Sequence, residues 1–202
     1  MQITKHNPVS TRYASVADFQ AIFEKEMNSL YLLSFLLTAD HEKAEQCFVG
    51  GLNDVIEGNP VFKDWAQGWA ERMIIQNALR VVNPQRNKSS EAPRTTFVNQ
   101  EGTPLAAAQQ AIAAILGLQP FDRFVYVMTV LAHYSDQNCC VLLGCTVRDV
   151  LAARIRALQQ VGNAMAAHHG ATTDPHPEKL TLRQLGGSAV GWLVIPNLAT
   201  SA

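Results

Sequence analysis

Apolar residues recur at steps of three and four along the first 82 residues, the spacing that places them on one face of an α-helix. The pattern predicts a single amphipathic helix at residues 15–38 and a second helix at residues 41–57, which Asp40 caps and Gly58 ends. A third helix is predicted at residues 60–82, with a proline at its first-turn position. Three such helices can close around one core.

The composition changes at residues 83–103, where the chain is polar, contains two prolines and has no apolar period. Such a segment is typical of a linker. Helical periodicity returns in an Ala-rich segment at 104–116 and an apolar-striped segment at 120–134. The chain is therefore predicted to be all-α, with helical domains at residues 10–82 and 104–163 joined by the linker.

The second domain contains the signals of two helices joined by a tight turn. Ser135 can cap the first helix by accepting the amide of Asn138, and Gly144 suits the left-handed backbone that ends it. Thr146 and Asp149 can cap the next helix reciprocally. This order predicts a helix-turn-helix.

Charge limits the classes of partner. Only 16% of the residues are charged and the formal net charge is −1. Strong non-specific attraction to nucleic acid requires clustered Lys and Arg, which release counterions from the phosphates. The composition therefore argues against a protein that binds nucleic acid through charge alone.

The four cysteines are predicted to be reduced thiols. The N-terminus lacks the apolar region of a signal peptide, and no apolar run is long enough to span a membrane, so a cytoplasmic protein is expected. Cys139, Cys140 and Cys145 fall within the helix-turn-helix, and their spacing lacks the C-x2-C arrangement of a zinc knuckle. Burial as small hydrophobes is favoured over a metal or redox site, with Cys140 expected where the two helices approach most closely.

Catalysis has little support in the sequence. A Ser-His-Asp spacing, a phosphate-binding loop, an H-E-x-x-H motif and a pair of carboxylates are all absent. His168, His169 and His176 could hold a metal, but Asp174 and Glu178 are the only nearby acids that could orient their rings, so a solvated segment is favoured. We expect no enzyme activity, no cofactor, no metal and no small-molecule substrate.

The apolar and turn positions form a recognisable skeleton in both domains. In the second domain it comprises Tyr134-Ser135, Leu143-Gly144, Cys145-Thr146, Val150 and Arg156-Ala157. In the first domain it comprises Leu30-Tyr31, Ala44-Glu45, Phe62, Trp65, Ala70 and Arg72. In this skeleton, over about residues 16–162, the chain resembles the extracytoplasmic-function group of bacterial RNA polymerase sigma factors.

The resemblance implies a transcription initiation factor that binds core RNA polymerase and gives it promoter specificity, with promoter DNA and an anti-sigma factor as further partners. The residues that it places on the −35 element are Thr146, Val147, Arg148, Leu151, Arg154 and Arg156. Those that it places near the −10 element are Lys63, Trp65, Arg72 and Arg80. Those that it places on the polymerase are Glu45, Gln46 and Val49.

The two tryptophans of the third predicted helix have two interpretations. Aromatic residues at helical spacing mostly fill cores, so core packing is favoured for both Trp65 and Trp69. The alternative is that a DNA base stacks on an exposed aromatic residue in the loop before this helix.

Several family positions carry other residues here, and they support a second hypothesis. Gln46 stands where the family has Asp, and Val49 where it has Gln. Leu151 and Ala153 stand where the family has Lys and Arg. Together with the near-neutral charge, these residues favour a sigma-like interaction protein that no longer binds promoter DNA.

Residues 164–202 form a C-terminal extension outside the resemblance. They end in an apolar run that includes Trp192, Leu193 and Ile195. A free terminus would not normally expose such a run, so we expect it to pack on a helical domain or a partner and to regulate binding.

Overall fold

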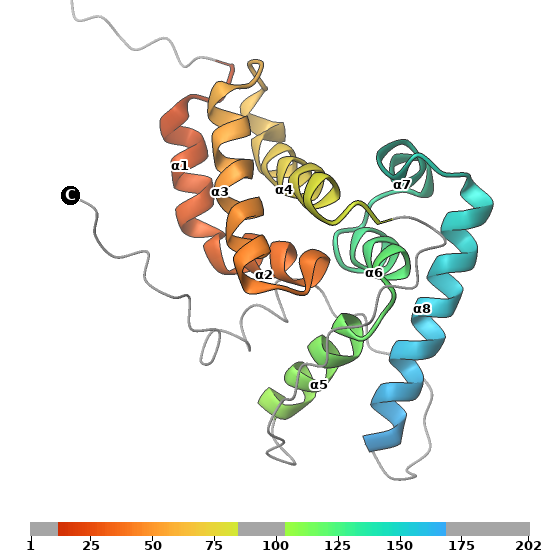
Figure 1. Ribbon diagram of the computed structural model, residues 1–202. Helices are drawn as coiled ribbons and strands as arrows, with labels where there is room; N and C mark the ends of the chain where they lie inside the picture. The colour runs from red at the N-terminus through yellow and green to blue at the C-terminus, as the bar shows by residue number, and fades with distance from the viewer. Residues whose placement is uncertain (1–11, 85–103, 169–202) are drawn as a thin grey trace, which may run out of the picture.

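The computed structural model describes residues 12–84 and 104–168, and these residues form an all-α structure, as predicted (Figure 1). The only strand-like feature of this part of the chain is an isolated bridge between Tyr13 and Phe62. The N-terminal elements are α1 (Val16–Lys25), α2 (Met27–Thr38), α3 (His41–Glu57), the 3-10 turn η1 (Lys63–Trp65) and α4 (Ala66–Val82). The C-terminal elements are α5 (Pro104–Leu116), α6 (Pro120–Tyr126), the π-helical turn η2 (Val127–Leu131), α7 (Asp136–Leu143) and α8 (Val147–His168).

The prediction of one continuous helix at residues 15–38 was wrong. The chain leaves helical geometry at Glu26 and forms two helices, α1 and α2. A capping box fixes the start of α1: Ser15 accepts the amide of Asp18, whose carboxylate accepts the amide of Ser15. Helix α2 is not amphipathic. Every residue from Leu30 to Thr38 is buried, as expected for a helix that is apolar on all sides.

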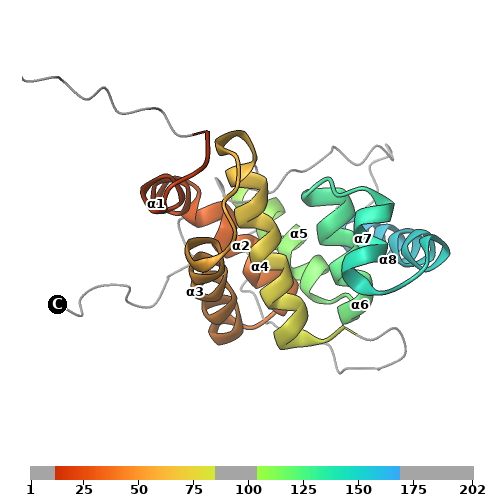
Figure 2. The same ribbon diagram turned by 90° about the horizontal axis from the view of Figure 1, so that it is seen from above.

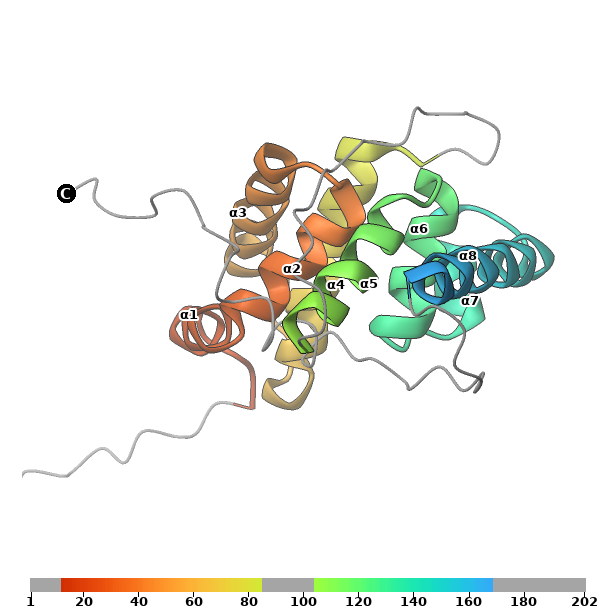
Figure 3. The ribbon, with the colours of Figure 1, turned by 90° about the horizontal axis from the view of Figure 1, so that it is seen from below.

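Helix α2 is buried on all sides because both halves of the chain pack against it. Helices α3 and α4 lie against it from the N-terminal half, and α5 and α6 lie against it from the C-terminal half (Figures 2 and 3). The buried residues of both halves therefore form one continuous hydrophobic core.

Arg123 joins the two halves by hydrogen bonds. Its side chain is 2% exposed, and its Nε and Nη2 donate to the Leu37 carbonyl at 3.3 and 3.2 Å. Nη1 donates to the carbonyls of Leu116 and Leu118 at 3.4 and 3.3 Å. The guanidinium thus satisfies carbonyls at the C-terminal ends of α2 and α5, where the helix dipole favours a cation. Burial lowers its pKa to about 10, so it remains a cation at neutral pH.

The third helix begins later than predicted. Pro60 precedes α4, because the segment after Gly58 pairs in extended form with the residues before α1. The Ala14 amide donates to the Val61 carbonyl at 2.7 Å, and the Lys63 amide donates to the Arg12 carbonyl at 3.0 Å. The end at Val82 and the bounds of α3 agree with the predictions, and Asp40 caps α3 as expected.

The predicted helix at residues 120–134 is also shorter. Helix α6 passes into the wider turn η2, where the Ala132 amide donates to the Val127 carbonyl at 2.9 Å, and regular structure ends at Leu131. At the other end of the chain, α8 extends to His168, beyond the predicted boundary at residue 163. Most of the predicted linker and C-terminal extension lies outside the described residues.

Two glycines give a test of helix packing with opposite expected signs. A Cβ at Gly51 of α3 would lie 2.8 Å from Cγ1 and 3.3 Å from the backbone nitrogen of Ile74 in α4. We expect Gly51→Ala to lower the free energy of unfolding by about 1–3 kcal/mol, because α3 and α4 must separate. Around Gly68, in contrast, the added carbon has open space: among the described residues, apart from its chain neighbours and the adjacent backbone of α4, no atom lies within 4 Å. Gly68→Ala should raise the free energy of unfolding by about 0.5–1 kcal/mol, and urea denaturation measures both changes. A loss of stability in both variants would contradict the packing assignment.

Candidate nucleic-acid interface

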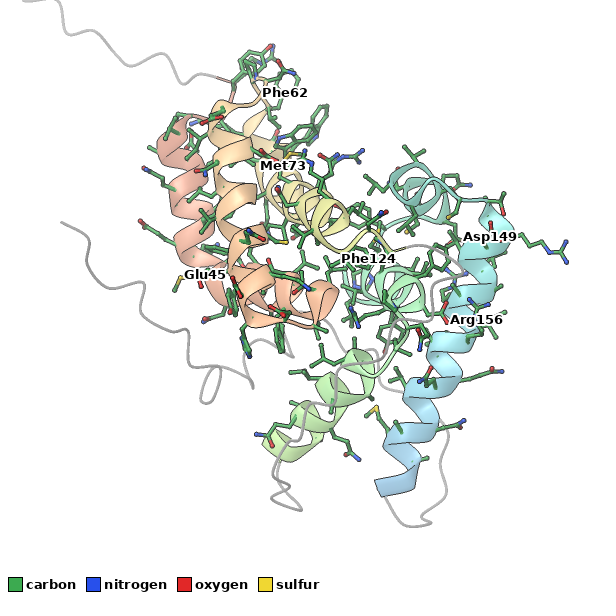
Figure 4. The ribbon with its side chains drawn as sticks, viewed as in Figure 1. Glu45, Phe62, Met73, Phe124, Asp149 and Arg156 are labelled. Atoms are coloured by element: carbon green, nitrogen blue, oxygen red, sulfur yellow. The ribbon has the colours of Figure 1, made fainter. Side chains whose placement is uncertain are left out.

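The start of α8 is fixed by the local interactions that the sequence predicted. Ser135 accepts the Asn138 amide at 3.2 Å and caps α7, and Gly144 ends that helix with a φ of 62°. The Thr146 hydroxyl donates to the Asp149 carboxylate at 2.8 Å and accepts the Asp149 amide at 3.3 Å. These caps fix where α7 begins and ends and where α8 begins, and Figure 4 labels Asp149 near the start of α8.

One face of α8 is buried against the C-terminal half of the molecule, and its buried residues are Val150, Ala153, Ala157 and Val161. Ala153 stands where the family has Arg, but its position faces the core. The alanine therefore removes no charge from the outer surface of this helix.

The cysteines differ in burial from one another. Cys139 is fully buried, which confirms a core role, and burial raises its pKa to about 12. Cys140 was expected at the closest approach of the two helices, but it is only half-buried, as is Cys145. Cys47 is fully buried in α3, where desolvation raises its pKa to about 11.

Two of the arginines predicted to contact the −35 element are held by acids of the same chain. Arg154 donates to Asp136 of α7 at 2.8 Å. Arg156 donates two hydrogen bonds to Asp122 of α6, at 2.6 and 3.0 Å, and this contact raises the pKa of the Arg156 guanidinium (Figure 4). Both pairs fasten α8 to neighbouring helices, and each carboxylate offsets the charge that would attract a phosphate. Their acidic partners were not predicted from the sequence.

The outer face of α8 is largely apolar. Thr146 and Arg148 are exposed at its start, and an apolar stripe then follows the helix at intervals of four, four and three residues. This α8 stripe consists of Val147, Leu151, Ile155 and Leu158, with exposed fractions of 38–56%. Ile155 and Leu158 were not predicted as site residues from the sequence. Their helical spacing relative to Leu151 could have indicated that they share its face of the helix.

The structure corrects the interpretation of Trp65. Its side chain is 66% exposed, so it does not fill the core, whereas Trp69 is half-buried and packs against the core. The Phe62 ring lies edge-on to Trp65 with centroids 5.2 Å apart, and it stacks on Tyr13 at 4.9 Å. These three side chains form an exposed aromatic cluster at the head of α4, and Figure 4 marks Phe62 there.

Backbone pairing holds the aromatic cluster in place. Residues 12–14 and 61–63 are joined by the bridge between Tyr13 and Phe62 and by the two backbone hydrogen bonds that flank it. The sequence identified Trp65 as a candidate but missed Tyr13, because the contact joins segments almost 50 residues apart. The result is an exposed and preorganised aromatic surface.

The predicted basic residues near the −10 element do not form one cluster, because Lys63 lies in η1 and the two arginines lie along α4. Lys63 is ion-paired with Asp18 at 3.2 Å, and the hydrogen bonds from Ser15 and Lys63 lower the Asp18 pKa to about 2. Arg72 is half-buried, and Arg80 is exposed and ion-paired with Asp54 at 3.0 Å. Arg80 follows the start of α4 by about 20 Å along the helix axis, given the rise of 1.5 Å per residue.

The residues predicted to contact the polymerase lie together on α3. Gln46 and Val49 are exposed, and Glu45 beside them is half-buried. Figure 4 labels Glu45. Asn53 and Ile56 continue the same exposed line at helical spacing. This outer face is uncharged apart from its edges, which suits contact with another protein better than contact with a phosphate backbone.

Comparison with protein-family models, with curated proteins and with solved structures finds no match to this chain. Within the described residues, no helix is both long enough and apolar enough to cross a membrane. The same part of the chain contains no group of three or more His, Cys, Asp or Glu side chains placed to hold a metal ion. His169 and His176 lie outside the described residues, as does the side chain of His168.

Proposed function

We propose that the protein is a sigma-like transcription initiation factor that binds core RNA polymerase and contacts promoter DNA. The observation that carries the proposal is the exposed aromatic cluster of Tyr13, Phe62 and Trp65 at the head of α4. Two helical domains are part of this proposal, an N-terminal domain with −10 contacts and a C-terminal helix-turn-helix domain with −35 contacts.

The aromatic cluster suits unpaired DNA. An exposed tryptophan offers a flat π-surface to any base, and base stacking of this kind contributes about 1–3 kcal/mol per base. Because Phe62 and the backbone bridge already hold Trp65 in place, less side-chain entropy is lost on binding. Arg72 and Arg80 lie further along α4, where they could follow the phosphates of the same strand if Arg80 exchanges its ion pair with Asp54 for a phosphate.

The cluster gives a direct test of the proposal. We expect Trp65→Ala to weaken binding of fluorescein-labelled single-stranded DNA by the complex with core polymerase by roughly 5- to 150-fold, from the stacking energy. Fluorescence anisotropy measures the affinity. The matched control is Val81→Ala, which truncates an exposed apolar side chain at the far end of α4 and should leave the affinity unchanged. Equal affinity of the Trp65 variant and the wild type would reject the stacking role, provided that circular dichroism shows both to be folded.

The α8 stripe supports a second candidate, a sigma-like protein that binds another protein through this helix. Its outer face presents four apolar side chains, and Arg154 and Arg156 are occupied by Asp136 and Asp122. Salt dependence separates the two candidates. Affinity for duplex promoter DNA should fall steeply with salt and weaken further in Arg148→Ala, whereas an apolar interface should be nearly insensitive to salt and should be lost in Ile155→Ser.

The two predicted DNA-contacting regions also bear on how the factor would work. At the end of α4, Leu79 and Arg80 lie beside Leu142 and Leu143 of α7, around an open cavity of about 260 Å³. The two halves therefore face each other across this cavity. Simultaneous contact with two separate promoter elements would require these halves to move apart, so we propose that the described arrangement is a closed form.

A further inference from the structure

The turn between α7 and α8 brings two cysteines close together. The Cys145 amide donates to the Cys140 carbonyl at 3.1 Å, across a Gly144 that has left-handed geometry. This six-residue closure is the Schellman arrangement, in which the side chains of the first and last residues commonly touch. At this turn both side chains are thiols.

The backbone geometry is compatible with a disulfide. The path from the Cys140 Cα through its carbonyl and the 3.1 Å hydrogen bond to the Cys145 Cα limits the Cα separation to at most about 7 Å. Disulfides usually span about 4.4–6.8 Å between Cα atoms. Both side chains are half-buried and pack against the edge of the same core, so they remain within reach of small oxidants.

We propose that Cys140 and Cys145 are an oxidation site that forms a reversible disulfide on exposure to a hydroperoxide. One thiolate attacks the peroxide, an S–O bond forms as the O–O bond breaks, and the leaving oxygen departs as water or an alcohol after taking up a proton. The second thiol attacks the sulfenic sulfur, the S–S bond forms, and a second water leaves. The two thiols lose two electrons in total, and the peroxide gains them.

The other two cysteines lack this hydrogen bond across the turn, although Cys139 lies near enough to Cys140 and Cys145 for their charges to contribute to its raised pKa. Cys139 is fully buried, and its side chain leaves α7 in a different direction from that of its neighbour Cys140. Cys47 is fully buried in α3. Burial raises the pKa of both thiols, to about 12 and about 11, so neither supplies the thiolate that reacts with peroxide at neutral pH. They therefore serve as internal controls.

The disulfide would close a ring of six residues over the end of α7 and the entry to α8. Leu142, Leu143 and Gly144 lie within this ring, and Thr146 follows it directly. The angle between α7 and α8 would then be fixed by a covalent bond as well as by caps. The site does not depend on the proposed transcriptional role, so its test requires neither DNA nor polymerase.

The test treats the full-length protein with hydrogen peroxide, blocks the remaining thiols with N-ethylmaleimide and maps the tryptic peptides without reduction. Residues 124–148 form one tryptic peptide that contains Cys139, Cys140 and Cys145. The expected peptide contains one disulfide and one cysteine alkylated by N-ethylmaleimide. Apart from the mass of that N-ethylmaleimide, it should be two hydrogen masses lighter than the fully reduced peptide. It should fragment between Cys139 and Cys140 but not between Cys140 and Cys145. Dithiothreitol should restore all four thiols.

Matched variants assign the bond. Cys140→Ser and Cys145→Ser should each abolish it, whereas Cys139→Ala and Cys47→Ala should retain it. A second probe avoids oxidation: one equivalent of phenylarsine oxide, which bridges two neighbouring thiols, should protect both residues from alkylation in the wild type and in neither serine variant. A disulfide through Cys139 or Cys47, a disulfide between two chains, or oxidation to sulfinic acid without a disulfide would overturn the proposal.

Discussion

Replacing Arg123 by methionine is expected to lower the free energy of unfolding by about 3–5 kcal/mol. The side chain is buried, and its guanidinium is the donor to the carbonyls of Leu37, Leu116 and Leu118. Methionine fills much of the same volume but donates nothing, so carbonyls at the ends of α2 and α5 lose this donor inside the protein. Urea denaturation followed by circular dichroism at 222 nm measures the change.

Two control variants test whether the loss of stability comes from the Arg123 hydrogen bonds. Arg148→Met makes the same chemical change at an exposed position of α8, and it should alter the free energy of unfolding by less than about 0.5 kcal/mol. Arg123→Lys keeps the charge but loses the planar fork that reaches several carbonyls, so its stability should lie between that of the wild type and the methionine variant. Equal stabilities of Arg123→Met and Arg148→Met would show that the Arg123 hydrogen bonds contribute little.

Replacing Phe124 by alanine is expected to lower the free energy of unfolding by about 3–5 kcal/mol, the usual cost of removing a buried aromatic ring. Phe124 is fully buried in α6 and belongs to the continuous core (Figure 4). Because that core extends to α2, α3 and α4, the substitution should also lower the stability of the N-terminal half of the molecule.

Tryptophan fluorescence can report that coupling. In a Trp192→Phe background, the remaining tryptophans are Trp65 and Trp69, and both lie in the N-terminal half. Phe124→Ala should shift their unfolding midpoint together with the midpoint seen by circular dichroism, because a single cooperative unit unfolds at one midpoint. Val141→Ala, at an exposed position of α7, is the control and should shift neither. An unchanged tryptophan midpoint in the Phe124 variant would mean that the halves unfold separately.

The local signals of the sequence predicted much of the helical structure. Asp40, Ser135 and the pair Thr146 and Asp149 make the predicted caps, because a cap depends on residues only three positions apart. Gly144 has the predicted left-handed backbone for the same reason. The bounds of α3 and α5 agree with the periodic pattern, which depends on the same short range.

The differences come from contacts between distant segments. Periodicity predicted one amphipathic helix at residues 15–38. The prediction failed for α2, because helices that begin more than 60 residues later cover it on a second side. Trp65 has helical spacing, yet the pairing of residues 12–14 with 61–63 leaves it on the surface. The acids that hold Arg154 and Arg156 are 18 and 34 residues away, so a list of basic residues overstates the charge available to DNA.

If the described arrangement is a closed form, the packing around α2 would raise the concentration that a partner of the open form needs. A ligand that requires the two halves to be apart binds only the open fraction of the molecules, so its apparent dissociation constant is the intrinsic value divided by that fraction. Opening would expose one side of a helix with nine consecutive buried residues and would separate Arg123 from the Leu37 carbonyl. Each tenfold reduction in the open fraction corresponds to about 1.4 kcal/mol of such contacts and raises the required partner concentration tenfold. The strength of this one packing interface therefore determines how abundant such a partner must be before the protein responds to it.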